Sequence, residues 1–515
     1  MRLVRAAAVV LSVTMLATPA AADSPPSAQV RTDKGVVRGE VLQDHRAFRG
    51  IPYAEPPVGA LRWRPPQPAR PWPGVRDATA FGSQCAQIAE VYGGRTTYGE
   101  DCLYLNVTTP LKGPLKGRGL PVMVWLHGGG NVSGNAAGYD LAKLATRGDV
   151  VVVSVNYRLG VLGWLAHPAL EAGERYQSGN YGLLDQQAAL RWVRRNIAAF
   201  GGDPGNVTLF GQSAGAADTC AGLASPTAAG LFHKAIAQSY VCSFPMRTEA
   251  QAEADGARFA GAVGCAAEAA ACLRALPVKT LMEAFKDRSP YPVAGGDRVL
   301  PVQPREAFES GRFNRVPVML GNTLDEMRLY AALIYPQPIT AAQYEKFVRD
   351  TYGAHADQIL ARYPAAGYPD LRIAVATVLT HATGPLATCG HQKAFGLFAK
   401  AGVPVYAYQF ADRTAPPLYD VPGYEEGAQH GTELTYLFPG LLGLLDAEQT
   451  RLSDAMAGYW TSFARDGRPA AAQAPRWPRF RGSGDVLSLA PGRGGIHPVD
   501  TAEASHCAFW DSIQP

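Results

Sequence analysis

Six short apolar runs alternate along this chain with stretches of helical periodicity. The runs cover residues 122–126, 150–155, 207–210, 235–238, 316–320 and 405–410. Their apolarity is largely continuous rather than alternating, which is typical of strands buried on both faces. Apolar residues recur at helical spacing over 181–200 and over about 448–465. The alternation predicts an α/β fold with a large, mostly parallel central sheet flanked by helices.

A serine between two glycines follows the third run, in Gly211-Gln212-Ser213-Ala214-Gly215. At a strand-to-helix junction this pattern predicts a nucleophile elbow, a sharp turn that raises the serine hydroxyl above the sheet. Glycine fits two positions to either side because a side chain there would collide with strand or helix backbone. The position of Ser213 agrees with the predicted fold, since the active sites of parallel α/β sheets form at the carboxyl ends of strands. The alternative is an ordinary glycine-rich turn.

A nucleophilic serine needs a histidine base and an acid that orients it. In this fold type the acid and then the histidine follow the serine along the chain. His430 is the best candidate base, because it lies in a turn-like stretch shortly after the sixth run. The acid should follow the fifth run, where residues 321–326 end in Asp325 and Glu326. Spacing alone does not separate these two acids.

The segment His127-Gly128-Gly129-Gly130 directly follows the first run. Glycines there let backbone N–H groups approach a developing oxyanion, and the N–H of Ala214 would add another donor. The alternative is a plain flexible turn. The position after an apolar strand and upstream of the serine favours the oxyanion hole.

The first residues have the pattern of a secretory signal peptide. Arg2 and Arg5 precede an apolar stretch over 6–16, and Ala20-Ala21-Ala22 resembles a cleavage site. We therefore predict a signal peptide over 1–22, one domain over 23–515 and an exported, periplasmic or secreted protein without a membrane span. The alternative is a retained N-terminal anchor. Richness in alanine, arginine and proline favours a bacterial source, and a net charge of +4 argues against a nucleic-acid surface.

Eight cysteines in an exported chain predict disulfides. The chain has no C-x-x-C pair, which argues against a zinc or thioredoxin-like site. Local spacing favours two pairs, and the remaining four cysteines would form the other two. The expected pairs are Cys85–Cys102, Cys265–Cys272, Cys220–Cys242 and Cys389–Cys507.

Several sequence blocks resemble the type-B carboxylesterase/cholinesterase family of α/β-hydrolases over nearly the whole mature chain. These blocks are RGIPYAEPP (49–57), EDCLYLNV (100–107), NYRLG (156–160), FGGDP (200–204) and HGTEL (430–434). Such a protein cleaves carboxylic esters through an acyl-enzyme, without a cofactor or metal. The resemblance therefore implies a small-molecule ester substrate, of small to medium size.

The resemblance also implies residue roles. Ser213 matches the nucleophile, His430 the base, and Glu326, rather than Asp325, the acid. Gly129, Gly130 and Ala214 match the oxyanion donors. Three of the expected disulfides match family positions, whereas Cys220–Cys242 does not.

Two departures from the family pattern affect the expected specificity. Gln212 stands where the family usually has glutamate, which predicts a weaker preference for cationic substrates and a less elevated pKa of His430. The segment 85–102 contains no tryptophan to hold a quaternary ammonium group, which argues against choline esters. The alternatives are an exported lipase, which would need a large apolar lid, and a non-catalytic, cholinesterase-like binding protein.

Overall fold

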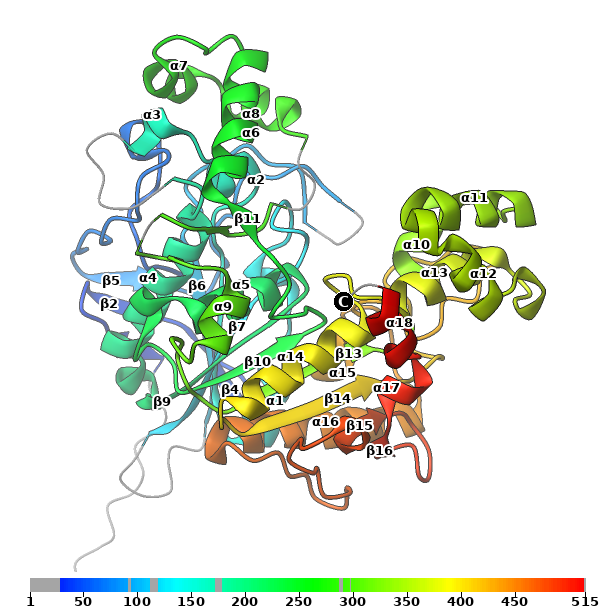
Figure 1. Ribbon diagram of the computed structural model, residues 1–515. Helices are drawn as coiled ribbons and strands as arrows, with labels where there is room; N and C mark the ends of the chain where they lie inside the picture. The colour runs from blue at the N-terminus through cyan, green and yellow to red at the C-terminus, as the bar shows by residue number, and fades with distance from the viewer. Residues whose placement is uncertain are drawn as a thin grey trace, which may run out of the picture.

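An eleven-stranded sheet forms the centre of the molecule (Figure 1). The computed structural model describes residues 28–90, 94–111, 119–171, 178–286, 290–296 and 298–513, so the predicted signal peptide lies outside the described residues. The sheet has the order β16-β15-β14-β13-β10-β9-β7-β8-β6-β4-β3. Its strands are β3 (Glu40–Val41), β4 (His45–Pro52), β6 (Tyr104–Pro110), β7 (Leu120–Leu126), β8 (Val151–Val155), β9 (Gly202–Gln212), β10 (Lys234–Gln238), β13 (Val318–Thr323), β14 (Val405–Phe410), β15 (Val486–Leu489) and β16 (His497–Val499).

The strands from β8 to β15 pair in parallel, and antiparallel strands complete both edges. All six strands predicted from apolar runs are present in the parallel part. The expected α/β architecture with a mostly parallel sheet is therefore confirmed. The antiparallel strands β3, β4, β6 and β16 were not predicted.

Helices cover both faces of the sheet, which explains the continuous apolarity of its strands. Val122, Val124 and Leu126 of β7 contribute to one core cluster, and Met123 and Trp125 contribute to the other. The first face carries α4 (Tyr181–Asn196), α5 (Ala214–Ala224) and α14 (Thr388–Lys400), and the second carries α1 (Ala142–Gly148) and α16 (Ala447–Asp466). Successive side chains of a strand point to opposite faces of the sheet. Because both faces are covered, every position of such a strand requires an apolar residue.

The predicted helix over 448–465 corresponds to α16 (Ala447–Asp466). Asp446 begins it with a capping box, because its side chain accepts hydrogen bonds from the N–H groups of Glu448 and Gln449. Gly467 ends it in the left-handed conformation, with φ of 70°. The helix over 181–200 is likewise present, as α4 followed by a short 3₁₀ turn, Ile197–Phe200.

Two groups of helices extend from this centre. At the top of Figure 1 lie α6 (Glu249–Ala262), α7 (Ala269–Ala275) and α8 (Val278–Ala284). At the right lie α10 (Arg328–Ile334), α11 (Ala341–Tyr352), α12 (Ala356–Arg362) and α13 (Leu371–His381), near α18 (Cys507–Ile513). This second group shares a core cluster of its own, in which Tyr344, Val375 and Trp510 are buried.

All four expected disulfides are present. Cys85–Cys102 and Cys265–Cys272 close short loops, whereas Cys389–Cys507 connects α14 to α18 across 118 residues. Cys220–Cys242, the pair without a family match, joins α5 to the segment after β10. In the described part of the chain, no helix combines the length and apolarity needed to cross a membrane.

Candidate active site

Ser213 lies at the junction between β9 and α5 in a strained conformation. Its φ is 56° and its ψ is −123°, a combination that non-glycine residues rarely adopt. The strain is held by hydrogen bonds, because the N–H of Ser213 donates to the Gln238 carbonyl at 2.9 Å. The Ser213 carbonyl in turn accepts from the N–H groups of Ala216 and Ala217, each at 2.9 Å. The residues on either side of Ser213 are buried, but Ser213 itself is only half-buried and therefore remains accessible.

The two glycines of the elbow are required by close backbone contacts. A Cβ on Gly211 would lie 2.3 Å from the Gly215 carbonyl oxygen, and one on Gly215 would lie 2.2 Å from the Leu126 carbonyl oxygen. Both distances are far below van der Waals contact, so any side chain would force strand and helix apart. The structure thus shows the predicted backbone collisions that require glycine at both positions.

His430 and Glu326 form a buried pair. Nδ1 of His430 lies 2.6 Å from Oε2 of Glu326, and their side chains are 3% and 0% exposed. The other carboxylate oxygen of Glu326 accepts from the Thr323 N–H at 2.8 Å, which fixes the side chain. Burial lowers the pKa of His430, but the charge and hydrogen bond of Glu326, helped by Glu433, outweigh it, so the pKa is raised above 6.5.

Asp325, the other candidate acid, contacts the loop of His430 rather than its ring. Its N–H donates to the Ala428 carbonyl at 3.1 Å, and its carboxylate accepts from the Ala428 N–H at 3.0 Å. The same carboxylate binds Arg413 at 2.9 and 3.0 Å and Arg328 at 3.3 Å. The structure therefore separates the two acids: Glu326 reaches His430, and Asp325 fastens the segment before it.

The glycine-rich loop after β7 lies directly against the elbow. A Cβ on Gly128 would be 3.1 Å from the Cβ of Ser213. Gly129 and Gly130 have φ of 103° and 63°, and the Gly129 carbonyl accepts from the N–H groups of Val132 and Ser133. The loop thus turns tightly beside Ser213, with Ala214 beginning α5 on the other side.

Buried contacts hold both ends of this loop. At its start, the Tyr157 hydroxyl donates to the His127 carbonyl at 2.6 Å, and the two rings stack at 4.5 Å. Burial lowers the pKa of His127 to about 4, so this ring is neutral at ordinary pH. At its end, the Gln87 amide both donates to and accepts from the backbone of Gly134, at 2.8 Å each.

Gln212, which replaces the usual family glutamate, contacts the second nitrogen of His430. Its Nε2 lies 3.1 Å from Nε2 of His430. An amide N–H donates to that nitrogen only when the ring is neutral, with its proton on Nδ1 facing Glu326. The contact therefore favours the tautomer in which Nε2 accepts a proton.

Two buried acids near the site were missed by the sequence analysis. Burial raises the pKa of Glu433 to about 7, and the charge of Glu326 adds to the effect. Burial also raises the pKa of Asp218, on α5, to about 7. Each could have been found: Glu433 stands three residues after His430, and Asp218 interrupts an otherwise small and apolar helix.

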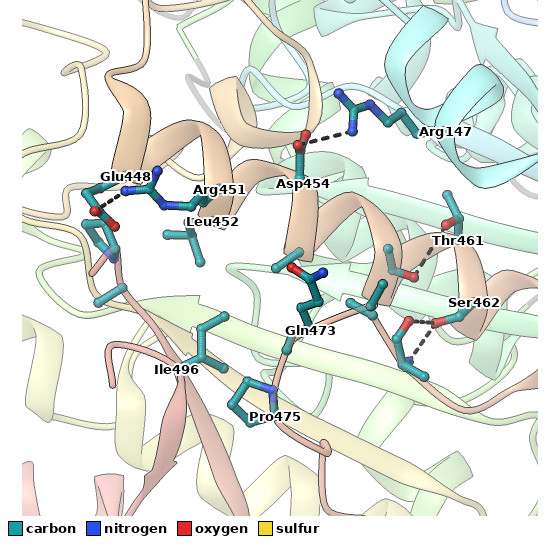
Figure 2. A pocket seen from close by; sticks show the side chains of 18 of the residues that line it. Arg147, Glu448, Arg451, Leu452, Asp454, Thr461, Ser462, Gln473, Pro475 and Ile496 are labelled. Atoms are coloured by element: carbon teal, nitrogen blue, oxygen red, sulfur yellow. Dashed lines mark hydrogen bonds and ion pairs between the residues drawn. The ribbon is translucent and has the colours of Figure 1, made fainter. Parts of the chain in front are cut away.

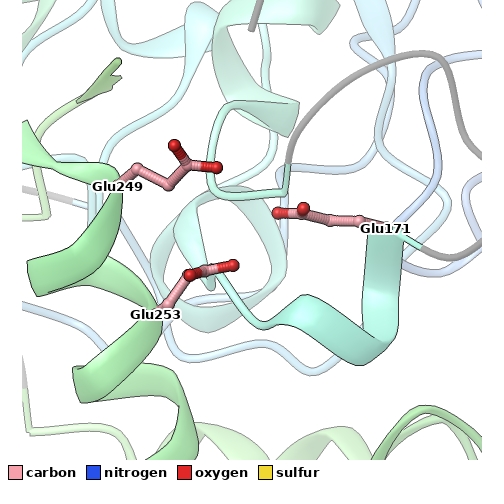
Figure 3. Close-up of side chains that lie close together, drawn as sticks. All are labelled: Glu171, Glu249 and Glu253. Carbon is pink, nitrogen blue, oxygen red and sulfur yellow. The ribbon is translucent and has the colours of Figure 1, made fainter. Parts of the chain in front are cut away.

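Two further features lie outside the elbow region. A groove of about 1000 Å³ follows α16, lined by Arg147, Arg451, Gln473 and Ile496 among others (Figure 2). Ser213, Glu326 and His430 are not among the described residues that line it. Glu171, Glu249 and Glu253 bring carboxylate oxygens within 4.8 Å of one another (Figure 3). They are half-buried, and such groups are common without a bound ion.

Comparison with known proteins identifies relatives over almost the whole chain. The model of the carboxylesterase family matches residues 26–510. Fumonisin B1 esterase of Sphingopyxis macrogoltabida is 36% identical, over 95% of this chain and 92% of the relative. The medium-chain fatty acyl-CoA hydrolase precursor of Anas platyrhynchos is 36% identical, over 90% and 88%. Human carboxylesterase 3 is 34% identical, over 93% and 90%.

Proposed function

This chain belongs to the carboxylesterase family and is a carboxylic ester hydrolase, and from this premise we propose that Ser213, His430 and Glu326 form its catalytic triad. The observation that carries the proposal is the buried 2.6 Å contact between His430 and Glu326. The 3.1 Å contact between Gln212 and His430 links the elbow to this pair.

In the proposed mechanism, the Ser213 hydroxyl attacks the ester carbonyl and Nε2 of His430 takes its proton. Glu326 holds the ring in the required tautomer and stabilises the imidazolium that forms. His430 then returns the proton to the departing alcohol, and an acyl-enzyme remains on Ser213. Water, deprotonated by His430, attacks the acyl carbonyl; the bond to the Ser213 oxygen then breaks, His430 returns the proton to that oxygen, and the acid is released.

The N–H groups of Gly129, Gly130 and Ala214 would stabilise the oxyanion of each tetrahedral intermediate. The position of Gly128 against the Cβ of Ser213 supports this role, because it brings the loop next to the attacked carbonyl. Backbone donors of this kind typically contribute about 10²–10³ in turnover each.

Before substrate binds, the Gln212 amide occupies Nε2 of His430. It must move away from this nitrogen when His430 accepts the proton of Ser213. We infer that its amide shields the neutral base before substrate binds and turns aside as Ser213 reacts.

We propose that the substrate is a small to medium carboxylic ester. The name of one relative, a medium-chain fatty acyl-CoA hydrolase precursor, supports acyl groups of medium length, and the name of another, a fumonisin B1 esterase, supports ester hydrolysis. An exported lipase is the second candidate, and it predicts activation at a lipid interface. A binding protein without catalysis predicts no covalent labelling of Ser213 by an organophosphate.

We also propose that the protein is exported. The charged and apolar pattern over residues 1–22 supports a signal peptide. Four disulfides are in keeping with an oxidising compartment. N-terminal sequencing of the exported protein would test this, with a mature start near Asp23 as the expected result.

Labelling with an organophosphate followed by peptide mapping tests the triad. The expected result is one modified residue, Ser213, and loss of esterase activity in proportion to labelling. Full inhibition with the label on another residue would contradict the assignment.

A further inference from the structure

Asp218 is a buried carboxylate held by amide groups. It lies on α5, five residues after Ser213, and is 1% exposed. Its Oδ2 accepts from Nε2 of Gln186 at 2.5 Å, and its Oδ1 accepts from Nδ2 of Asn131 at 3.2 Å. The proposed mechanism gives this acid no role. A buried charge without a cation is costly, so its presence beside the active site requires an explanation.

Asn131 connects Asp218 to the glycine-rich loop. It directly follows Gly130, is fully buried and has a φ of 58°. Its side chain also donates to the Pro290 carbonyl at 3.0 Å, and its own carbonyl accepts from the Gly160 N–H at 2.7 Å. The loop therefore leaves the oxyanion position through a residue that is fixed by three hydrogen bonds, one of them to α5.

We propose that Asp218 is a positioning residue for the oxyanion hole, holding the loop of Gly129 and Gly130 against the helix that begins with Ala214. The two sets of proposed donors belong to segments more than 80 residues apart, and the Asn131–Asp218 bond joins these segments directly. The inference rests on the proposed function, because it assigns Asp218 a role only if these N–H groups bind an oxyanion.

The chemistry of a carboxylate explains why aspartate stands at this position. Both oxygens of a carboxylate accept hydrogen bonds, so Asp218 binds the amides of α4 and of the loop at once. Alanine at 218 would remove both acceptor oxygens and leave the amides of Gln186 and Asn131 without this partner. The raised pKa of Asp218, caused by burial and opposed by the two amide bonds, reflects the cost of this arrangement.

Among the described residues, two buried tyrosines lie close enough to Asp218 for its charge to act on them. Burial is the main cause of the raised pKa of Tyr157 and Tyr240; the charge of Asp218 is the next cause for Tyr157, and for Tyr240 it comes after Tyr291. Tyr157 also donates to the His127 carbonyl, so a second side chain near Asp218 holds the start of the same loop.

Two substitutions remove the Asn131–Asp218 bond from opposite sides. Asp218→Ala deletes both acceptor oxygens, and Asn131→Gly deletes the amide while keeping a backbone that readily adopts φ of 58°. Thr219→Val is the matched control, because Thr219 is a buried neighbour on α5 whose hydroxyl donates within the helix, to the Gly215 carbonyl at 2.8 Å.

The experiment measures kcat and KM for a p-nitrophenyl ester, with active sites counted by organophosphate labelling of Ser213. We expect each substitution to lower kcat about tenfold to hundredfold, since displacement of catalytic groups has effects of this size. KM should change little, because oxyanion contacts strengthen in the transition state. Thr219→Val should keep the kcat of the wild type.

The double variant provides the second readout. If both side chains act through one bond, Asp218→Ala with Asn131→Gly should be no slower than the slower single variant. An unchanged kcat per labelled site in Asn131→Gly, or fully multiplicative losses in the double variant, would overturn the inference. If the Asp218 variant does not fold, kcat per labelled site in Asn131→Gly tests the inference by itself. Failure of wild-type Ser213 to label would instead refute the proposed function.

Discussion

Nδ1 of His430 lies 2.6 Å from Oε2 of Glu326, and both side chains are shielded from solvent. The neighbouring acid, Asp325, binds two arginines and the backbone of the His430 loop instead. Adjacent acids thus have separate tasks, because successive residues of a turn point in different directions. We therefore expect changes at Glu326 to affect activity and changes at Asp325 to affect stability.

The ionisation of His430 should set the acidic limb of the pH–rate profile. A general base must be neutral, and Glu326 raises the pKa of His430 above 6.5. Activity should therefore be lost as the pH falls through this raised pKa, and kcat/KM should report it for the free enzyme. The measurement is kcat/KM against pH between about 5 and 9.

Gln212→Glu should shift this limb to higher pH. The substitution replaces an amide that donates to Nε2 of His430 with a carboxylate that stabilises the imidazolium. We expect the apparent pKa to rise, and reactivity toward cationic esters to increase relative to neutral ones. Gln212→Met, which adds no charge, is the control. An unchanged acidic limb in Gln212→Glu would contradict this account.

Glu326→Gln and Asp325→Asn should separate activity from stability. Glu326→Gln should lower kcat on the order of 10⁴-fold, as loss of the orienting carboxylate does in serine proteases, with a small change in unfolding free energy. Asp325→Asn should reduce the unfolding free energy by about 2–3 kcal/mol, because it removes the buried carboxylate that Arg328 shares with Arg413 and leaves the exposed Glu425 as the remaining carboxylate partner of Arg328. Urea unfolding and steady-state kinetics on both variants test this. The opposite pattern would reverse the assignment of the two acids.

Gly215→Ala should disturb both the fold and the glycine-rich loop after β7. Its Cβ would lie 2.2 Å from the carbonyl oxygen of Leu126 and 2.7 Å from that of His127, which are backbone atoms. We expect a loss of about 3 kcal/mol or more in stability and a lower kcat. Gly222→Ala on the same helix is the control, since its Cβ would meet a Leu209 methyl at 3.3 Å. Equal thermal stability of the two variants would refute this explanation of the elbow glycines.

The disulfides should differ in their effect on stability. In the loop-entropy description, a bridge spanning 118 residues contributes about 5 kcal/mol and one spanning 7 residues about 2.5 kcal/mol. Replacing Cys389 and Cys507 with serine should therefore destabilise the protein more than replacing Cys265 and Cys272. Denaturant unfolding of the two double variants measures the difference. A larger loss from the short loop would contradict this expectation.

Much of the fold could be predicted from the sequence because the central strands are apolar on both faces. The outer strands could not be: β4 carries His45, Arg46 and Arg49 among its apolar residues, so its pattern is not that of a doubly buried strand. For the site, glycine spacing located Ser213 and the neighbouring loop. Spacing could not choose between Asp325 and Glu326, and the Asn131–Asp218 bond spans 87 residues and leaves no periodic pattern.

The most direct measurement of the central claim compares the wild type with Ser213→Ala on p-nitrophenyl esters of increasing acyl length. Loss of the nucleophile should remove most of the rate acceleration, on the order of 10⁶-fold in kcat. Activity in the wild type should be highest on short to medium acyl chains, without activation at a lipid interface. Turnover that survives in a folded Ser213→Ala protein would contradict the account, because another residue would then carry the reaction.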